Sequence, residues 1–274
     1  MARILAISSQ VARGAIGLSA AMPALQALGH EVIALPTILL SNHPGHARFA
    51  GERVAPALLM RMLDALEANG WLGGIDGVLT GYLPSPEHVA VAGAAIERLR
   101  RLAPSPLVVC DPVLGDEPKG LYIAREAAEA IREQLVPMAD VLKMNRFECE
   151  WLGGAVIASS DDVSRVADAR GWRSAIVTSL PVQGNRQLAN ILIEADAPPR
   201  EARVQRHERA PNGTGDLMGA LWLGHRLTGG CPATIAFDRA VAGVELVVAR
   251  SQGADELQLV PCLGQLASPG GDAR

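Results

Sequence analysis

Short apolar runs alternate with longer segments of helical periodicity along most of the chain. The runs are rich in Ala, Val, Ile and Leu and lie at Ile4–Ile7, Val32–Leu35, Gly77–Leu79, Leu107–Asp111, Val141–Met144 and Ala175–Thr178. An unbroken apolar run is typical of a strand covered on both faces, because a half-exposed strand alternates apolar and polar residues. We therefore expect these runs to form inner strands of a sheet.

Helical patterns fill the spaces between the runs. They lie at about Gly17–Leu28, Val54–Asn69, Pro86–Leu102, Arg125–Val136, Asp161–Arg170, Thr214–Thr228 and Thr234–Ser251. Several are followed by a glycine, as at Gly29, Gly70 and Gly171, which suits a left-handed C-terminal cap. Regular alternation of strand and helix favours right-handed βαβ units, so the sequence predicts the α/β class with a mostly parallel sheet.

The pattern changes near residue 187. Two strand-like segments, Leu188–Glu194 and Ala202–His207, flank the turn-forming Asp196-Ala197-Pro198-Pro199. This arrangement predicts an antiparallel hairpin added to the sheet. The chain shows no internal repeat and no long linker, so we expect one domain over residues 1–266 and a disordered tail over 267–274.

The composition narrows the class of protein. Of 274 residues, 49% are hydrophobic and 20% are charged, which is typical of a chain with a sizeable core. Twenty-five basic and 29 acidic residues give a net charge of −4, so we expect neither a nucleic acid nor a membrane as partner. The N-terminus does not resemble a signal peptide and the four cysteines lie far apart, which favours reduced thiols and a cytoplasmic protein.

The segment with most chemical content is Asn212-Gly213-Thr214-Gly215-Asp216, at the start of a predicted helix. Glycines let successive amides point in one direction, and a helix N-terminus favours an anion. A carboxylate in the first turn, Asp216, could then take a proton from a hydroxyl that attacks phosphorus. The alternative is an ordinary glycine turn before a helix, because this short pattern is common.

Two further polar groups follow predicted strands. Asp111 ends one strand, with Asp116 in the loop after it, and Asn145 and Glu148 follow another strand. Ligands of open parallel sheets bind beyond the carboxyl ends of strands, and oxygen ligands suit Mg²⁺. The alternatives are a turn former at Asp111 and a solvated helix start at Asn145. Taken with the glycine segment, these groups favour phosphoryl transfer from ATP without the P-loop motif, which the chain lacks.

Several short stretches, taken together in their order along the chain, match a known sequence pattern. They are Ile4-Leu5-Ala6-Ile7-Ser8-Ser9-Gln10-Val11, Leu40-Ser41-Asn42-His43, Leu79-Thr80-Gly81-Tyr82-Leu83, Cys110-Asp111-Pro112-Val113-Leu114-Gly115, Asn145-Arg146-Phe147-Glu148, Gly213-Thr214-Gly215-Asp216 and Asp255-Glu256-Leu257-Gln258-Leu259-Val260. The set resembles the ribokinase-like superfamily and, within it, the pyridoxal kinase family. That resemblance implies a three-layer α/β/α sandwich, a homodimer, and ATP-dependent phosphorylation of the 5′-hydroxymethyl group of pyridoxal, with pyridoxine and pyridoxamine as further substrates.

The resemblance also implies roles for individual residues. Asp216 would be the catalytic base, beside an anion site formed by Gly213, Thr214 and Gly215. The residues implied around ATP are Asp111, Asn145, Glu148, Thr178, Ser179, Gly213 and Gly215. Asp111 and Glu148 would belong to the shell of the Mg²⁺ that accompanies ATP, and a monovalent cation such as K⁺ is left open. The loop Asp116–Gly120 would close over the phosphates.

The vitamin side departs from the family pattern. The residues implied there are Ser9, Thr37, His43, Pro44, His46, Tyr82 and Asp216. The family has Thr where this chain has Pro44, an aromatic residue where it has His46, and Gly-Asn where it has Gly17-Leu18. Since all these changes fall on the acceptor side, two alternatives stay open: a kinase of another small alcohol such as hydroxymethylpyrimidine, or a vitamer-binding protein without turnover.

Overall fold

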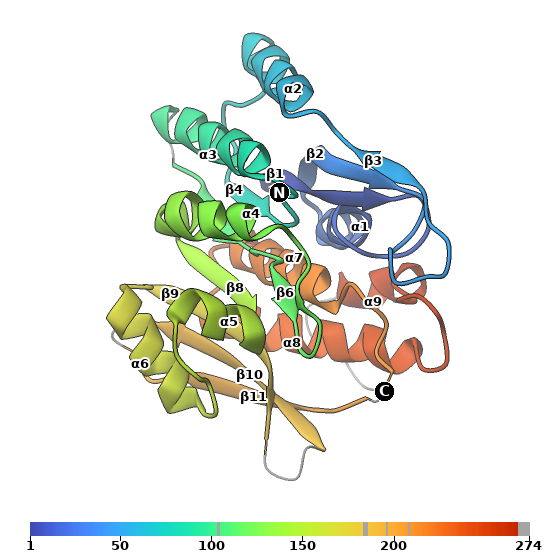
Figure 1. The fold of residues 1–274 in the computed structure, drawn as a ribbon, viewed down its shortest axis with the longest axis vertical. Helices are drawn as coiled ribbons and strands as arrows, with labels where there is room; N and C mark the ends of the chain where they lie inside the picture. The colour runs from blue at the N-terminus through green and yellow to red at the C-terminus, as the bar shows by residue number, and fades with distance from the viewer. Residues whose placement is uncertain (103–104, 183–185, 196, 208, 268–274) are drawn as a thin grey trace.

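The computed structural model describes residues 1–102, 105–182, 186–195, 197–207 and 209–267. A nine-stranded sheet runs through it in the order β11-β10-β9-β8-β5-β4-β1-β2-β3 (Figure 1). The strands of this sheet are β1 (Arg3–Val11), β2 (Glu31–Leu40), β3 (Gly51–Arg53), β4 (Gly77–Thr80), β5 (Leu107–Cys110), β8 (Val141–Asn145), β9 (Ser174–Pro181), β10 (Gln187–Glu194) and β11 (Arg200–Gln205). Pairing is parallel from β2 through to β9, while β3, β10 and β11 are antiparallel to their neighbours.

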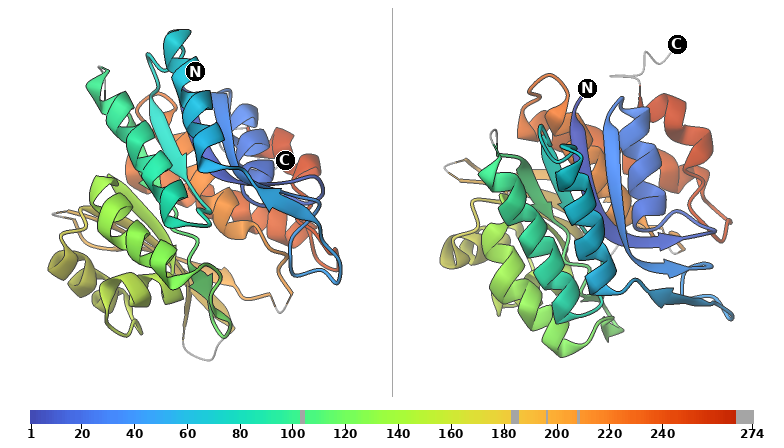
Figure 2. Two further views of the ribbon diagram at one scale, coloured as in Figure 1. Left: turned by 45° about the horizontal axis from the view of Figure 1, so that its top comes forward. Right: turned by 90° about the horizontal axis from the view of Figure 1, so that it is seen from above.

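Helices cover both faces of this sheet. They are α1 (Leu18–Ala27), α2 (Pro56–Ala68), α3 (Pro86–Arg101), α4 (Arg125–Ala130), α5 (Arg146–Gly153), α6 (Ser160–Arg170), α7 (Thr214–Leu227), α8 (Ala233–Arg250) and α9 (Leu263–Leu266). The views of Figures 1 and 2 show α2 to α6 on one face and α1, α7 and α8 on the other. The predicted α/β sandwich with a mostly parallel sheet and an added hairpin is confirmed.

The hydrophobic core is divided by the sheet into two clusters. Because side chains alternate along a strand, Leu5 and Ile7 of β1 face the cluster under α2 to α6, and Ile4 faces the one under α1, α7 and α8. Trp222 and Phe237 are the largest fully buried side chains of the second cluster. All six predicted apolar runs are strands of the inner, parallel part of the sheet, as expected from burial on both faces.

Three details differ from the sequence-based expectations. The helix predicted over Arg125–Val136 is α4 followed by a π-helical turn, Ile131–Leu135, and a 3₁₀ turn at Val136–Met138. Pro137 has no N–H to donate, so a regular helix does not continue through it. The sequence analysis also missed β3 and the small hairpin β6 (Gly115–Asp116) and β7 (Gly120–Leu121), whose strands are too short to show a pattern.

Two sequence-based expectations fall on residues outside the described ranges. Residues 268–274 of the predicted tail, and Asp196 of the predicted turn, lie outside the described residues. The single domain over 1–266 stays a prediction. Within the described ranges, no helix is long and apolar enough to span a membrane.

Candidate active site

The N-terminus of α7 is fixed by a glycine that no other residue can replace without rearrangement. Gly213 has φ of 103°, in the left-handed region, and accepts the first helical hydrogen bond from the N–H of Leu217 at 3.0 Å. A Cβ on Gly213 would lie 1.9 Å from the carbonyl oxygen of Ala15. The turn that frees the first amides of α7 is therefore pressed against the segment between β1 and α1.

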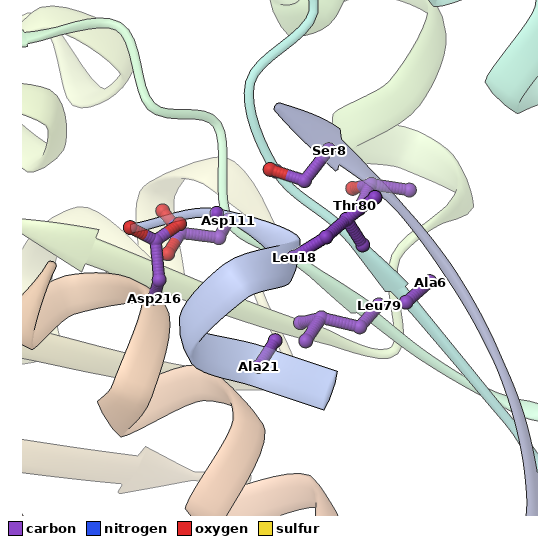
Figure 3. A pocket seen from close by; sticks show the side chains of 10 residues that line it. Ala6, Ser8, Leu18, Ala21, Leu79, Thr80, Asp111 and Asp216 are labelled. Carbon is purple, nitrogen blue, oxygen red and sulfur yellow. The ribbon is translucent and has the colours of Figure 1, made fainter. Parts of the chain in front are cut away.

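Asp216 lies in the first turn of α7 and meets Asp111, which follows β5. Both carboxylates point toward one another near the start of α1 (Figure 3). Loss of hydration on burial and the charge of Asp111 raise the pKa of Asp216 to about 6, while an N–H donated by Gly17 and the charge of Lys143 act in the opposite direction. Together with residues of β1, α1 and β4, the two carboxylates line a cavity of about 10 Å³, room for about one water, and we call this group of residues the floor of the site.

Lys143 of β8 supplies a positive charge to this floor. Its Nζ donates to Oδ2 of Asp111 at 2.7 Å, and both side chains are about 5% exposed or less. Burial by itself would lower the pKa of Lys143, but the charges of Asp111, Glu148 and Asp216 outweigh it and the pKa is raised. Lys143 is therefore an ammonium ion at neutral pH.

Glu148 is held between two segments of backbone. Its Oε1 accepts from the N–H of Leu114 and its Oε2 from the N–H of Asn145, both at 2.8 Å. Asn145 in turn accepts from the N–H of Glu148, which completes a capping box at the start of α5. Burial and the charge of Asp111 raise the pKa of Glu148. Glu148 thus joins the loop after β5 to the helix after β8.

The backbone is strained where two strands end at this site. Val113, in the loop after Asp111, has φ of 44°, and Ser179 in β9 has φ of 64°. A β-branched residue adopts such a conformation only when its surroundings impose it, and such strain concentrates at functional sites. Thr178 lies beside Asn145 across the β8–β9 pairing and donates its hydroxyl to the carbonyl of Met144 at 3.3 Å. Ser179 is exposed, and its N–H donates to Oδ1 of Asn190 at 3.4 Å.

The loop after β6 lies over the same end of the sheet. Tyr122 donates to the carboxylate of Asp116, and burial together with that contact raises the pKa of Tyr122. The ammonium of Lys119 lies 5.9 Å from the ring centre of Tyr122. Glu117 pairs with Arg146 of α5. Asp116 is therefore part of the loop's own scaffold, and Lys119 is the exposed cation of that loop.

On the acceptor side, two histidines join distant segments. The side chain of His43 contacts the amide of Asn212, next to Gly213, with 3.2 Å between Nδ1 and Nδ2. Burial and the charge of Lys119 lower the pKa of His43. His46 places its Nε2 2.8 Å from Oε1 of Glu256, while Pro44 is exposed at the tip of the loop. The 41–50 loop is thus tied to the motif before α7 and to the C-terminal segment.

The other predicted vitamin contacts form a layer at the end of β1. The Ser9 side chain packs against Gly17, where a Cβ would lie 2.3 Å from its Oγ. The fully buried Thr37 donates to the carbonyl of Tyr82 at 2.7 Å, and the N–H of Tyr82 donates to Oγ of Ser8 at 3.0 Å. Ser9 and Thr37 therefore shape the backbone of this layer, and their contact with the vitamin stays a prediction.

The donor set fits a magnesium ion that arrives with its nucleotide better than a cation held by the protein. Oδ1 of Asp111 is buried without a hydrogen-bond partner among the described residues, whereas Oδ2 is held by Lys143 and both oxygens of Glu148 accept amides. No group of three His, Cys, Asp or Glu in the described ranges could hold a metal. Mg²⁺ is commonly bound through one carboxylate and substrate phosphates, and Asp111 offers that carboxylate.

Sequence reasoning assigned no site role to Lys143, Ser8 or Thr80, and it noted Gly17 and Leu18 only as a departure from the family pattern on the acceptor side. Ser8 and Thr80 gave no signal of their own, because they read as ordinary strand residues. Lys143 did give one: it is a lone charge inside an apolar run, and the chain has only one other lysine, Lys119. A charge at such a position is costly unless it is paired.

Comparisons with known proteins agree with one another. A family model described as phosphomethylpyrimidine kinase matches residues 13–255. The chain is 34% identical to a pyridoxal kinase PdxY of Deinococcus radiodurans, covering 97% of this chain and 93% of that protein. It is 37% identical to a pyridoxine/pyridoxal/pyridoxamine kinase of Bordetella avium over 82% and 78% of the two chains. The crystal structure of Leishmania donovani pyridoxal kinase with ADP and pyridoxamine superposes with a TM-score of 0.89, 27% identity and coverage of 98% and 96%.

Proposed function

The chain belongs to the pyridoxal kinase family, and from that membership we propose how its residues carry out the ATP-dependent phosphorylation of vitamin B6. The protein is a kinase that converts a B6 vitamer and ATP into the phosphorylated vitamer and ADP. The observation that supports the residue assignment is the meeting of Asp216, Asp111 and Lys143 at the N-terminus of α7.

Asp216 is the general base of this proposal. The 5′-hydroxyl of the vitamin loses its proton to the Asp216 carboxylate while its oxygen attacks the γ-phosphorus of ATP, and the bond from that phosphorus to the bridging oxygen of ADP breaks. The amides of Gly213, Thr214 and Gly215 stabilise the charge on the transferring group, because they lie at the positive end of α7. A base with pKa near 6 is ionised at neutral pH and still basic enough to accept the proton.

The nucleotide side is assigned to the residues at the ends of β5, β8 and β9. These are Asp111, Asn145, Glu148, Thr178 and Ser179. Mg²⁺ would be held by the phosphates and Oδ1 of Asp111, and it would neutralise charge on the leaving diphosphate. Glu148 acts indirectly, because its carboxylate accepts the N–H groups of Leu114 and Asn145 and so fixes that backbone. The exposed Lys119 belongs to the loop that covers the phosphates.

The vitamin side is assigned to Ser9, Thr37, Tyr82 and the 41–50 loop with His43, Pro44 and His46. Its support is that His43 contacts Asn212, directly before the anion site. His46 is one of the side chains assigned to the vitamin, and its Nε2 already forms a hydrogen bond with Glu256. Hydroxymethylpyrimidine is the second acceptor to be tested, because the matched family model carries the phosphomethylpyrimidine kinase description.

The acceptor is tested by a substrate panel. With ATP and Mg²⁺, we expect ADP release when pyridoxal is the acceptor. We also expect release with pyridoxine or pyridoxamine, and the relative rates show which vitamer is preferred. Mass spectrometry of the product identifies the phosphate ester. Turnover with hydroxymethylpyrimidine alone would reassign the acceptor, and tight pyridoxal binding without ADP release would identify a binding protein instead.

The pH dependence of the reaction should report Asp216. Since burial and Asp111 raise its pKa to about 6, the ionised fraction falls as pH drops below that value. We expect kcat/KM to be level above about pH 7 and to fall roughly tenfold per pH unit well below pH 6, because the free enzyme must supply an ionised base. Profiles measured with two vitamers separate the enzyme's titration from the substrate's. A level profile down to pH 5 would contradict the assignment.

A homodimer in the cytoplasm is also proposed. Support for an interface comes from the β2–β3 hairpin, an edge of the sheet, where Leu39 is 47% and Phe49 is 55% exposed. Sedimentation equilibrium measures the oligomeric state directly, and Phe49→Ser should favour the monomer if this hairpin is the contact.

A further inference from the structure

The use of lysine in this chain is unusual. Of its 25 basic residues, only Lys119 and Lys143 are lysines, and both lie at the candidate active site. Lys143 is the one inside the protein, in a strand whose other core residues, Val141, Leu142 and Met144, are apolar and buried. Burying an ammonium ion costs several kcal/mol unless close partners compensate. The buried charge of Lys143 therefore depends on close negative partners, of which Asp111 is the nearest recorded one.

Helix α7 leaves space for the Lys143 side chain. A Cβ on Gly215 would lie 2.8 Å from Nζ of Lys143, and one on Gly219 would lie 3.9 Å from Cδ. The Lys143 side chain thus extends beneath the first two turns of α7 and ends under the amides of the proposed anion site. Two glycines of α7 leave the space that it fills.

The ammonium group stands among three carboxylates that come from different elements. Oδ2 of Asp111 accepts from Nζ at 2.7 Å, and Glu148 and Asp216 interact with the same charge. Three carboxylates at such a site repel one another and require a positive partner. Mg²⁺ reaches Oδ1 of Asp111 together with the phosphates that offset its charge, but a monovalent cation held by these carboxylates alone would be repelled by Lys143 and would find both oxygens of Glu148 already accepting amides. A bound K⁺ therefore does not fit this site.

We propose that Lys143 is the built-in cation of the active site, which holds Asp111 and Asp216 in register beneath the anion-binding turn and makes a protein-bound monovalent cation unnecessary. It is a positioning residue, because it acts through the carboxylates. The proposal rests on the proposed kinase site, but its central claim concerns the charge balance of the ligand-free protein. It can therefore fail or stand independently of the reaction.

The first test uses the ligand-free protein. Melting temperatures are measured in KCl, NH₄Cl and tetramethylammonium chloride at equal ionic strength. We expect the wild-type protein to melt at the same temperature in all three salts, and Lys143→Ala to melt lower and to regain several degrees in K⁺ or NH₄⁺, which enter the space left by the ammonium. Lys143→Met fills that space without a charge and should show no regain. A wild-type protein stabilised specifically by K⁺ would overturn the proposal, and this arm stands even if Lys143→Ala does not fold.

The second test measures turnover with pyridoxal in the same salts. Wild-type rates should agree within about twofold, and Lys143→Ala should lose roughly 10²-fold, as removal of one electrostatic group from such a site does, and recover at least about tenfold in NH₄⁺ or K⁺. Lys119→Ala, the other lysine, should show no salt-specific recovery. Loss that no cation restores, in a variant that folds, would overturn the proposal. Absence of turnover in the wild type would instead count against the kinase, while the melting data still decide the role of Lys143.

Discussion

Asp216→Asn is expected to lower kcat for pyridoxal by roughly 10²–10⁴, the usual contribution of a general base. Asparagine has nearly the same shape and can still accept the N–H of Gly17, so the first turn of α7 should remain in place. Unlike the carboxylate, it cannot accept the proton of the attacking hydroxyl. The loss should therefore fall on kcat, with KM for ATP changed little.

The effect of Asp216→Asn on the melting temperature can be predicted separately from its effect on turnover. The pKa of Asp216 is higher in the folded protein than in the unfolded chain, so its favourable contribution is full below the unfolded value and is lost as pH rises through about 6. At pH 8 the wild type carries a buried charge that Asp216→Asn does not. We expect the variant to melt at the same temperature as the wild type or higher, which separates a chemical loss from a folding defect.

Steady-state kinetics and a thermal melt at pH 8 check both parts. A matched control is Asp64→Asn in α2, because Asp64 is exposed and pairs with Arg98 at the surface. Its kcat should equal that of the wild type, since exposed pairs contribute about 0–1 kcal/mol. Near-normal turnover by Asp216→Asn would remove Asp216 from the role of base.

The second large effect is expected for Gly213→Ala. A Cβ there would lie 1.9 Å from the carbonyl oxygen of Ala15, which is backbone and cannot move aside as a side chain can. Gly213 must also hold φ of 103°, which an alanine rarely adopts. Either the first turn of α7 or the Ala15 segment must shift, and the amides of the anion site shift with it. We expect kcat to fall roughly 10²–10³-fold, as when a donor to a developing charge is lost.

Gly229→Ala is a control that separates the effect of backbone strain from the effect of the close approach to Ala15. Gly229 also has a left-handed φ, 60°, but a Cβ there would have nothing within 4 Å. It follows α7 at the other end of the helix, so its alanine variant should lose about 1–2 kcal/mol of stability from backbone strain alone and keep its kcat. If Gly213→Ala behaves like Gly229→Ala in both melting and turnover, the close approach at Ala15 does not shape the anion site.

Much of the fold could be predicted from local patterns. The six inner strands were found because burial on both faces of a parallel sheet leaves an unbroken apolar run, and the hairpin because Pro and Asp mark its turn. The change from α-helix to a π-helical turn after Ala130 was missed, because the helical periodicity of the Arg125–Val136 segment continues past that residue. The short strands β3, β6 and β7 depend on pairing with a neighbour, which no local pattern reveals.

For the candidate active site, local sequence patterns were enough to indicate the glycine turn at Gly213, the carboxylates Asp111 and Asp216, and the sheet edge that gathers them. These follow from the rule that parallel strands present their carboxyl ends on one side. The pairing of Lys143 with Asp111 and the bond between His46 and Glu256, which are far apart along the chain, became visible only in the folded structure. Such contacts, and the pKa of Asp216 that depends on them, arise from packing between distant elements, because burial and charge act through space and not along the sequence.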